Sequence, residues 1–370
     1  MANLRDRLKH IQELKKTQTA RKTECDLSDG VNELTDIGWE SCGYKVMKRE
    51  VTFPSPFKTI RKIPAALPLL VPDLAERDIP QLSDFLFFDL ETTGLSGGAG
   101  TVAFLAAFGR LTTPDEGCGK LIITQYLLLD YPGENDFLQA VLNEFKNARS
   151  VITTYNGKCF DSQILKTRCL MNAIKPPLYS HADLLHPARR LWKNIIRDCS
   201  QASVEKNILG IDRGDDIPGA LAPEIWFEFL KTGKTQRLRG ICDHNSADIA
   251  GLASILAAIV KIAHNPPAAD NFDIERLSLF WRDYIRRKEK FVNDDAFAGL
   301  RLTGEKLLRL AADRNFKHAV YVRSYDLMKE GNYKEALVYV KRGLKLFEEG
   351  TAWHDKLLRR KERLIKTVSR

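Results

Sequence analysis

The stretch DFLFFDLETTGL at residues 84–95 decides the fold of this chain. Its apolar run 85–88 does not alternate with polar residues, which is typical of a central strand covered by helices on both faces. Asp89 and Glu91 follow at a spacing of two, so both carboxylates point to the same face of the strand. Two like charges at the end of a buried strand repel unless a divalent cation lies between them, and hard oxygen ligands suit Mg²⁺ or Mn²⁺. For these two residues alone, a strand that ends in two solvated acids is the alternative.

The length of 370 residues predicts two or three domains, and a hydrophobic content of 44% is enough to build a core. No run of about 18 apolar residues is present, so we expect no membrane-spanning segment. The charged stretch 1–23 predicts an exposed helix rather than an apolar signal region, and hence a cytoplasmic protein. Seven cysteines without a CxxC pair argue against a disulfide framework and against a zinc site.

The net charge of +9 is concentrated in the last hundred residues. Residues 271–370 hold 24 lysines and arginines against 15 acidic residues, so their surplus equals that of the whole chain. Such an excess of positive charge suits a polyanionic partner such as nucleic acid, and a solvated helical surface is an equal alternative.

The order of the elements predicts an α/β fold. The expected strands cover residues 84–89, 101–111, 121–132, 150–155 and 178–180. The expected helices between the later strands cover residues 134–148, 158–173 and 183–192. Short connections join the first three strands, which predicts an antiparallel order. Alternating helices and further strands then predict a mixed sheet flanked by helices.

The remaining segments are an irregular arm and a helical region. Six prolines in residues 24–80 forbid a long helix, and short extended pieces are expected at 51–57 and 66–72. Two helices ending at Gly210 and Gly233 precede a long helix from about residue 236 to 263, since glycine is a common helix C-cap. Everything beyond residue 271 indicates helix.

Three further residues are candidates for chemistry. Asp161 lies in the first turn of the helix expected at 158–173, where a carboxylate is favoured by the helix dipole, and helix stabilisation alone would explain it. His244 and Asp248 stand at i and i+4 in the long helix, so they share one face. An exposed pair or a core histidine is the alternative for these two residues. The HxDxxH pattern at 181–186 favours a helix-capping Asp183 and structural histidines over a metal cluster.

Together, DLETTGL at 89–95, NGxxFD at 156–161 and HxxxD at 244–248 resemble the three motifs of the DEDD exonucleases of the ribonuclease H-like superfamily. The surrounding sequences are similar to its YprB-like branch, and residues 317–350 resemble a tetratricopeptide-like helix pair, with a plain helical hairpin as the alternative. The resemblance implies an arm at 1–80, a ribonuclease H-like α/β domain at 81–263 and a helical, tetratricopeptide-like domain at 271–370.

The resemblance also implies the site. The metal-binding carboxylates would be Asp89, Glu91, Asp161 and Asp248, with His244 as general base. Contacts to the terminal nucleotide would come from Thr92, Thr93, Gly94, Leu95, Asn156 and Phe160. Two Mg²⁺ or Mn²⁺ ions about 4 Å apart would then support phosphodiester hydrolysis.

The expected function is that of a 3′–5′ exonuclease on single-stranded DNA or RNA. The alternative is a non-catalytic nucleic-acid-binding scaffold whose helical tail docks a protein partner.

The spacing of the proposed general base departs from the family pattern. In histidine-type members of the family the histidine stands five residues before the last aspartate, whereas His244 stands four before Asp248, the spacing of tyrosine-type members.

Overall fold

The computed structural model describes residues 30–57, 63, 66–71, 80–94, 100–112, 119–146, 149–214, 216–266, 271–288 and 295–368. The helix predicted at 1–23 lies outside them. The described residues divide into two compact units. The first unit comprises those up to 64, 73–186 and 200–258, and the second those within 65–72, 187–199 and from 259 onward.

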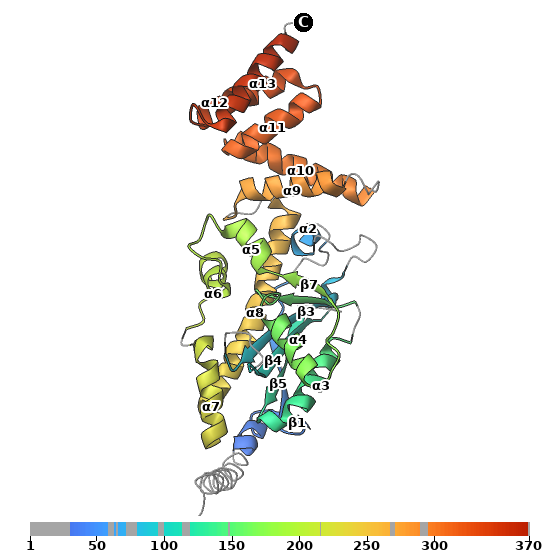
Figure 1. Ribbon diagram of the computed structural model, residues 1–370, viewed down its shortest axis with the longest axis vertical. Helices are drawn as coiled ribbons and strands as arrows, with labels where there is room; N and C mark the ends of the chain where they lie inside the picture. The colour runs from blue at the N-terminus through green and yellow to red at the C-terminus, as the bar shows by residue number, and fades with distance from the viewer. Residues whose placement is uncertain are drawn as a thin grey trace, which may run out of the picture. The chain divides into compact units, whose positions relative to one another are not determined.

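A seven-stranded mixed sheet forms the centre of the first unit (Figure 1), in the order β1-β2-β5-β4-β3-β6-β7. Its strands are β1 Glu40–Gly43, β2 Val46–Pro54, β3 Phe85–Thr92, β4 Ala103–Leu111, β5 Lys120–Leu128, β6 Val151–Thr154 and β7 Ser180–Asp183. β3, β4 and β5 pair antiparallel, whereas β6 pairs parallel with β3 and with β7. The predicted mixed sheet is confirmed.

The sheet is wider than predicted, because β1 and β2 add to its β5 edge. The expectation of an irregular arm is wrong for residues 40–50, whereas the extended piece expected at 51–57 overlaps the end of β2. The charges within β2 conceal the strand in the sequence, and Arg49 is buried because it lies over the Trp39 ring and bonds to Gln125 of β5. The extended piece expected at 66–72 is also wrong, since Leu67–Leu70 forms a short helix, α2, with Pro68 in its first turn, where proline is tolerated.

The helices that follow the strands lie close to their predicted positions. They are α3 Glu134–Glu144, α4 Asp161–Met171, α5 Leu185–Trp192, α6 Gln201–Val204, a π-helix Glu205–Leu209, α7 Ala222–Thr232 and α8 Gln236–His264. Gly210 and Gly233 adopt left-handed backbone conformations with φ of 67° and 70°, so both predicted C-caps are confirmed.

Alternation along β3 separates the apolar core from the carboxylates. Phe88 stacks on Phe108 of β4 with ring centroids 5.0 Å apart, and both rings contact Phe145 at the end of α3. Asp89, one residue further, therefore points to the opposite face of the sheet. Asn245 of α8 contacts Asp89 there. α8 therefore covers the carboxylate face of β3.

Within the described part of the chain, α8 is the one helix with the length and hydropathy of a membrane span. Of its most apolar 18-residue window, 61% is buried inside the protein. Leu238, Ile241 and Cys242 of α8 belong to the same apolar cluster as Leu86 and Phe88 of β3. This burial is that of a core helix.

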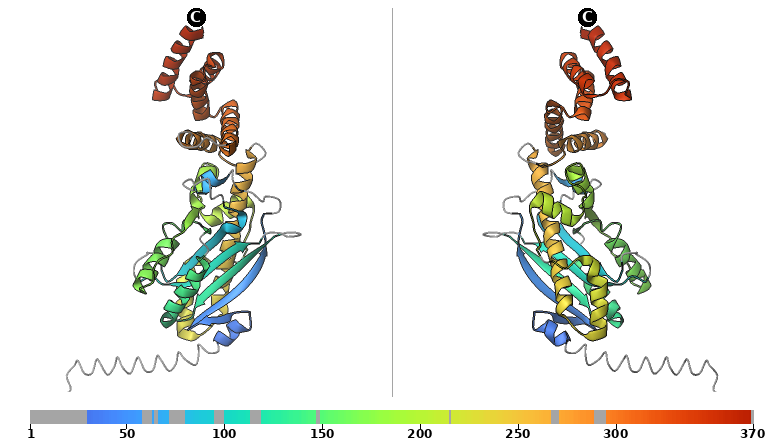
Figure 2. Two further views of the ribbon diagram at one scale, coloured as in Figure 1. Left: turned by 90° about the vertical axis from the view of Figure 1, so that its right-hand side faces the viewer. Right: turned by 90° about the vertical axis from the view of Figure 1, so that its left-hand side faces the viewer.

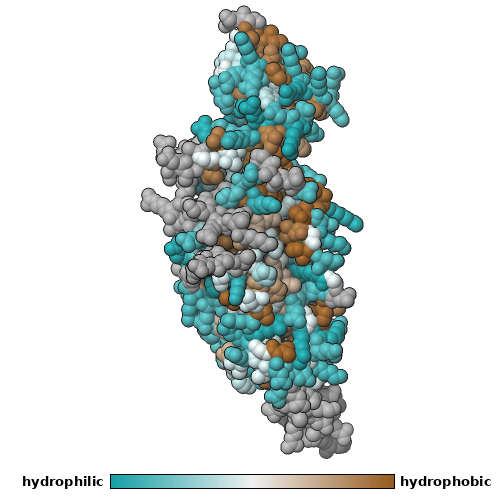
Figure 3. Space-filling model, turned by 180° about the vertical axis from the view of Figure 1, so that it is seen from behind, coloured by the Kyte–Doolittle hydropathy of each residue, from teal (hydrophilic) through white to brown (hydrophobic). Residues whose placement is uncertain are grey.

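The second unit is helical. From residue 271 onward its helices are α9 Ile274–Lys288, α10 Asp295–Asp313, α11 Lys317–Lys329, α12 Tyr333–Leu346 and α13 Ala352–Val368. Each helix packs against the next (Figure 2), as the predicted helical region requires. On the face drawn in Figure 3, hydrophilic residues cover much of these helices. α11 and α12 form the predicted helix pair with Gly331 at the turn, and its tetratricopeptide-like character stays a prediction.

Candidate metal centre

A row of side chains across the sheet holds α8 beside Asp89. The strand register aligns Arg49 of β2, Gln125 of β5, Ala107 of β4 and Asp89 of β3. Asn245 of α8 spans the small Ala107, because its Oδ1 accepts from Gln125 Nε2 at 2.9 Å and its Nδ2 donates to Asp89 Oδ2 at 2.7 Å. Arg49 Nε donates to Gln125 Oε1 at 2.6 Å and fixes the orientation of that amide. The sheet therefore orients Asp89 through a buried amide pair.

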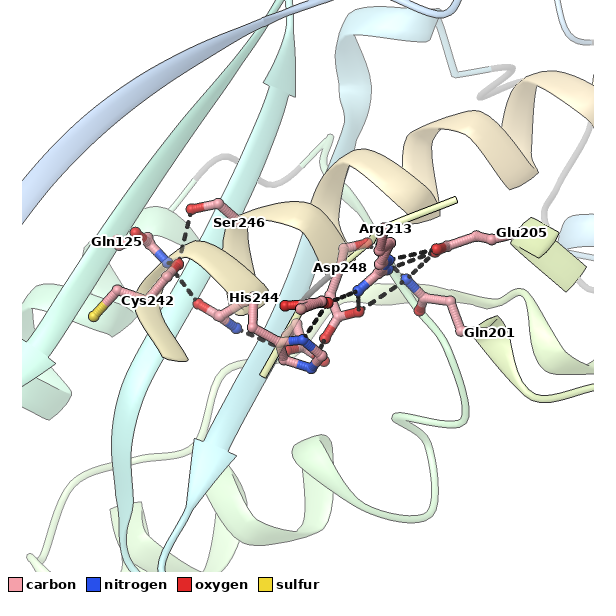
Figure 4. Close-up of polar contacts among 11 residues, drawn as sticks. Gln125, Gln201, Glu205, Arg213, Cys242, His244, Ser246 and Asp248 are labelled. Atoms are coloured by element: carbon pink, nitrogen blue, oxygen red, sulfur yellow. Dashed lines mark hydrogen bonds and ion pairs between the residues drawn. The ribbon is translucent and has the colours of Figure 1, made fainter. Parts of the chain in front are cut away.

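Three predicted site residues converge next to Asp89. Glu91, His244 and Asp248 each offer one ligand atom, and these atoms lie within 4.8 Å of one another. They are the one group of this kind among the described residues. His244 and Asp248 lie one turn apart on α8 (Figure 4), with His244 Nε2 at 3.2 Å from Asp248 Oδ2. The spacing of four residues thus directs both side chains to one place.

Asp161 adds a carboxylate from a third element. It is the first residue of α4 and is buried. A backbone hydrogen bond from Leu90, the residue after Asp89, favours its charged form. Its negative charge in turn raises the pKa of Asp89. All four predicted carboxylates therefore act on one another electrostatically.

Burial and mutual repulsion make this cluster unusually basic. Burial raises the pKa of Asp89 well above its ordinary value, and the charges of Asp161, Asp248 and Glu91 raise it further. Burial likewise raises the pKa of Glu91 to about 8 and that of Asp161 to about 7, with neighbouring carboxylates contributing to both. Perturbed carboxylates of this kind are concentrated at functional sites.

A buried ion pair supports Asp248 from the opposite side to His244 (Figure 4). Arg213 Nη1 lies 2.7 Å from Asp248 Oδ1. The other edge of the same guanidinium meets Glu205, with Nε to Oε2 at 2.6 Å and Nη2 to Oε1 at 2.7 Å. The Glu205 side chain is only 2% exposed and lies against Gly251 of α8, where a Cβ atom would come within 1.8 Å of Oε1. Gly251 therefore leaves the room that Glu205 occupies.

We expect Arg213→Gln to lower the free energy of unfolding by about 3–5 kcal/mol, because the buried Glu205 carboxylate loses its ion pair and, among the described residues, keeps only the hydrogen bond from Gln201. The double substitution Arg213→Gln with Glu205→Gln removes both charges and should recover most of that loss. Urea unfolding of the full chain measures both effects. A single Arg213→Gln variant as stable as the wild type would show that the pair does not support the site.

Asp216 holds the His244 ring. Its Oδ2 lies 2.7 Å from His244 Nδ1, and a carboxylate at that nitrogen favours the tautomer with the proton on Nδ1. The Nε2 atom then faces Asp248 and Glu91 as an acceptor. Arg213 Nη1 lies 3.4 Å from the same Asp216 oxygen. Arg213 therefore contacts both Asp248 and the carboxylate that orients His244.

The predicted nucleotide contacts after β3 have internal roles in the structure. Thr92 Oγ1 donates to the Gly94 carbonyl at 2.9 Å. Thr93 Oγ1 accepts from the Val102 backbone amide at 2.9 Å, which leaves its proton free to donate elsewhere. Leu95 lies outside the described residues. The substrate contacts of this turn stay predictions.

Asn156 and Phe160 flank the loop that leads into α4. Asn156 has a left-handed backbone with φ of 64°, and its backbone N–H donates to Asp183 Oδ1 at 2.7 Å. The Lys158 amide donates to Asp183 Oδ2 at 3.1 Å, so one buried carboxylate fixes the loop. The Phe160 side chain precedes Asp161 and is 46% exposed. An exposed aromatic ring beside buried acids is available for stacking, and its predicted role also stays open to test.

The HxDxxH residues do not form a ligand group. Besides the loop amides, Asp183 accepts from the backbone amide of Leu185, the first residue of α5, as the predicted cap requires. His181 Nε2 lies 2.9 Å from Thr154 Oγ1, and burial lowers the pKa of His181 to about 4. His186 is exposed. The interpretation of these residues as structural agrees with their contacts.

Sequence reasoning missed the residues that orient the predicted ones. These are Gln125, Glu205, Arg213, Asp216 and Asn245. An amide side chain is unfavourable in a helix interior, so the presence of Asn245 next to His244 is a weak indication in the sequence that this residue has a role at the site. No local pattern identifies a residue such as Arg213 in the loop before α7.

The donor set fits divalent metal ions. Four carboxylates supply hard oxygen ligands and can balance the charge of two divalent cations. In the described part of the chain, Asp89, Glu91 and Asp161 have no ion pair with a basic side chain, and Asp248 alone is paired with Arg213. Bound cations would remove the repulsion that raises these pKa values. The sequence and the geometry therefore both support a candidate metal centre.

Comparison with known structures finds exonuclease I repeatedly. Its complex with SSB-Ct aligns with a TM-score of 0.32 and 18% identity, over 55% of this chain and 43% of that chain. Escherichia coli exonuclease I in complex with a dT13 oligonucleotide aligns with a TM-score of 0.28 and 19% identity, over 42% of each chain.

Comparison of sequences gives a stronger match. YprB of Bacillus subtilis (strain 168) is 40% identical over 182 residues, which are 48% of this chain and 42% of YprB. The chain thus spans less than half the length of that relative. Residues 86–260 match the RNase H superfamily, and this range includes β3 from its second residue, β4 to β7 and all but the last turn of α8. The superfamily match covers 175 of the 370 residues of this chain.

Proposed function

We propose that this protein is a divalent-metal-dependent nuclease that acts as a 3′–5′ exonuclease on single-stranded DNA or RNA. The observation that carries the proposal is the convergence of Glu91, His244 and Asp248 within 4.8 Å, beside the strongly perturbed Asp89. The RNase H superfamily domain at residues 86–260 supports hydrolysis of phosphodiester bonds as the reaction class.

Four carboxylates, those of Asp89, Glu91, Asp161 and Asp248, would hold Mg²⁺ or Mn²⁺. When bound there, the cations would activate water and stabilise the leaving oxygen of the phosphodiester. Asn245 orients Asp89 for this task, and the guanidinium of Arg213 orients Asp248.

His244 is the proposed general base. Asp216 holds its Nδ1 at 2.7 Å and leaves Nε2 on the side of the carboxylates, 3.2 Å from Asp248. From that position Nε2 can take a proton from attacking water. The exposed ring of Phe160 next to Asp161 would stack on a terminal base, since aromatic rings bind bases without regard to sequence.

The test is digestion of end-labelled single-stranded DNA and RNA with Mg²⁺, with Mn²⁺ and with EDTA. Labels at the 5′ end and at the 3′ end distinguish the polarity, and a circular substrate distinguishes exonuclease from endonuclease. Cleavage that persists in EDTA, or its absence from every substrate with metal, would overturn the proposal.

We expect His244→Asn to lower the cleavage rate by about 10²-fold or more, because a positioned base contributes that much to proton transfer. His186→Asn removes an exposed histidine and is the matched control, with unchanged cleavage expected. Full activity in His244→Asn would leave the carboxylates as the whole catalytic site.

A further inference from the structure

The helical unit contains a basic pocket that the proposed nuclease site does not use. It has a volume of about 240 Å³ and is lined by side chains of α9, α10 and α11. Its cationic lining residues are Arg282, Arg286, Arg301, Arg323 and Lys329. Three acidic side chains also line it, so two positive charges are in excess. The pocket is therefore suited to an anion.

Ion pairs within the unit account for part of this charge. Arg282 donates two hydrogen bonds to Asp326 from one edge of its guanidinium, Nε to Oδ2 at 2.5 Å and Nη2 to Oδ1 at 2.6 Å. Arg286 Nη2 lies 3.4 Å from the same carboxylate, and Arg301 pairs with Glu305 one turn along α10 at 3.2 Å. Asp326 and Glu305, two of the three acids of the pocket, are thus paired with cations of α9 and α10.

The two cationic lining residues of α11, Arg323 and Lys329, take no part in these ion pairs. Arg323 Nε is buried and has no hydrogen-bond partner among the described residues. A buried guanidinium donor without an acceptor is costly, and the Arg323 side chain also lines the pocket, so its guanidinium is available to an anion there. No ion pair of Lys329 occurs in the described part of the chain, and its side chain is exposed at the pocket.

Two of the cations are held in place by one aromatic ring. The Arg286 guanidinium lies 5.9 Å and the Lys329 ammonium 5.7 Å from the centre of the Tyr325 ring. Cation–π contacts of this kind restrict side chains that would otherwise lose rotamer freedom on binding. The pocket is therefore partly organised before an anion arrives.

We propose that this pocket binds a backbone phosphate of single-stranded nucleic acid. Arginine forks match phosphate oxygens, and a surplus of two charges suits one phosphate group. The surrounding residues 271–370 carry the whole net charge of the chain, which favours a polyanion over a peptide with isolated acids. The choice of nucleic acid rests on the proposed nuclease function, and it adds a second contact for the same substrate.

The experiment measures binding of fluorescein-labelled dT20 to the full chain by anisotropy, in EDTA, at several salt concentrations. We expect Arg323→Gln with Lys329→Gln to weaken binding about 10-fold and to reduce the salt slope by about 0.7 per lost phosphate contact. Arg363→Gln with Lys366→Gln removes the same charge from exposed positions of α13, outside the pocket, and should change binding less than twofold. If the double variant unfolds, Lys329→Gln alone still tests the pocket, because Lys329 is exposed. We expect this variant to bind dT20 about threefold more weakly.

If both double variants weaken dT20 binding equally, binding depends on diffuse surface charge and not on the pocket, and the proposal is overturned. Displacement of dT20 by poly-glutamate as readily as by polyphosphate would assign the pocket to an acidic polypeptide and would overturn it too. Cleavage by the wild type with Mg²⁺ is measured separately. Binding through the pocket without any cleavage would end the nuclease proposal alone, whereas cleavage with unchanged binding in the pocket variants would end this one alone.

Discussion

Replacing Asp89 with asparagine is expected to lower metal-dependent cleavage by about 10³-fold, because several kcal/mol of transition-state stabilisation depend on the bound cations. The same change should leave the fold intact. Asn245 Nδ2 donates to Asp89 Oδ2 at 2.7 Å, and the amide oxygen of an asparagine can accept that bond. In EDTA the variant should be at least as stable as the wild type, since it loses a carboxylate that its neighbours repel.

The control is Asp243→Asn on the same helix as Asn245. The Asp243 side chain is 71% exposed and pairs with Arg49 at 2.8 Å, away from the carboxylates. The Asp243 carboxylate is largely exposed and takes no part in the bond from Arg49 to Gln125, so cleavage should change less than twofold. Equal rates of cleavage in Asp89→Asn and in the wild type would remove the hydrolytic assignment. A large loss of thermal stability in Asp89→Asn would instead give Asp89 a structural role.

In EDTA, the melting temperature of the protein is expected to fall as pH rises from 5 to 9. Burial raises the pKa of Glu91 from 4.5 to about 8 and that of Asp161 from 3.8 to about 7. The folded state therefore keeps protons that the unfolded state has released. The stability that these groups contribute is complete below about pH 4 and is lost as pH rises through about 7 and then about 8.

The expected fall is on the order of 10 °C, since one pKa unit is about 1.4 kcal/mol and 1 kcal/mol moves the melting temperature by about 2–4 °C in domains of this size. Mn²⁺ should reverse most of it, because a cation that binds only the folded state stabilises it. Glu91→Gln removes one titrating group, so the melting temperature of this variant in EDTA should fall less steeply as pH rises. Identical pH profiles for Glu91→Gln and the wild type would contradict the assignment of the perturbed pKa.

Local periodicity sufficed for the centre of the fold and for the predicted acids. The apolar run before Asp89 identifies a buried central strand, and a period of two places Glu91 on the same face. A period near four places His244 and Asp248 together on α8, and their side chains are 3.2 Å apart. These relations hold within one element, so they need no knowledge of the rest of the chain.

Residues that depend on distant partners could not be predicted in this way. β2 contains Lys48, Arg49 and Glu50 in succession, and as a local pattern it resembles a surface segment. It becomes a strand of the sheet because it pairs with β5 over nine residues, and because Gln125 accepts a hydrogen bond from the buried Arg49. Burial of a charge is decided by its partner, and the partner lies 76 positions away in the sequence.

The sequence by itself determined the mixed α/β sheet, the strand that carries Asp89 and Glu91, and the helix that carries Asp248. Only the tertiary structure decided how these acids are held: Asn245 orients Asp89, and Arg213 joins Asp248 to the buried Glu205. The physical reason is the range of the interactions. Backbone geometry repeats over two to four residues, whereas hydrogen bonds and ion pairs join whatever side chains the folded chain brings together.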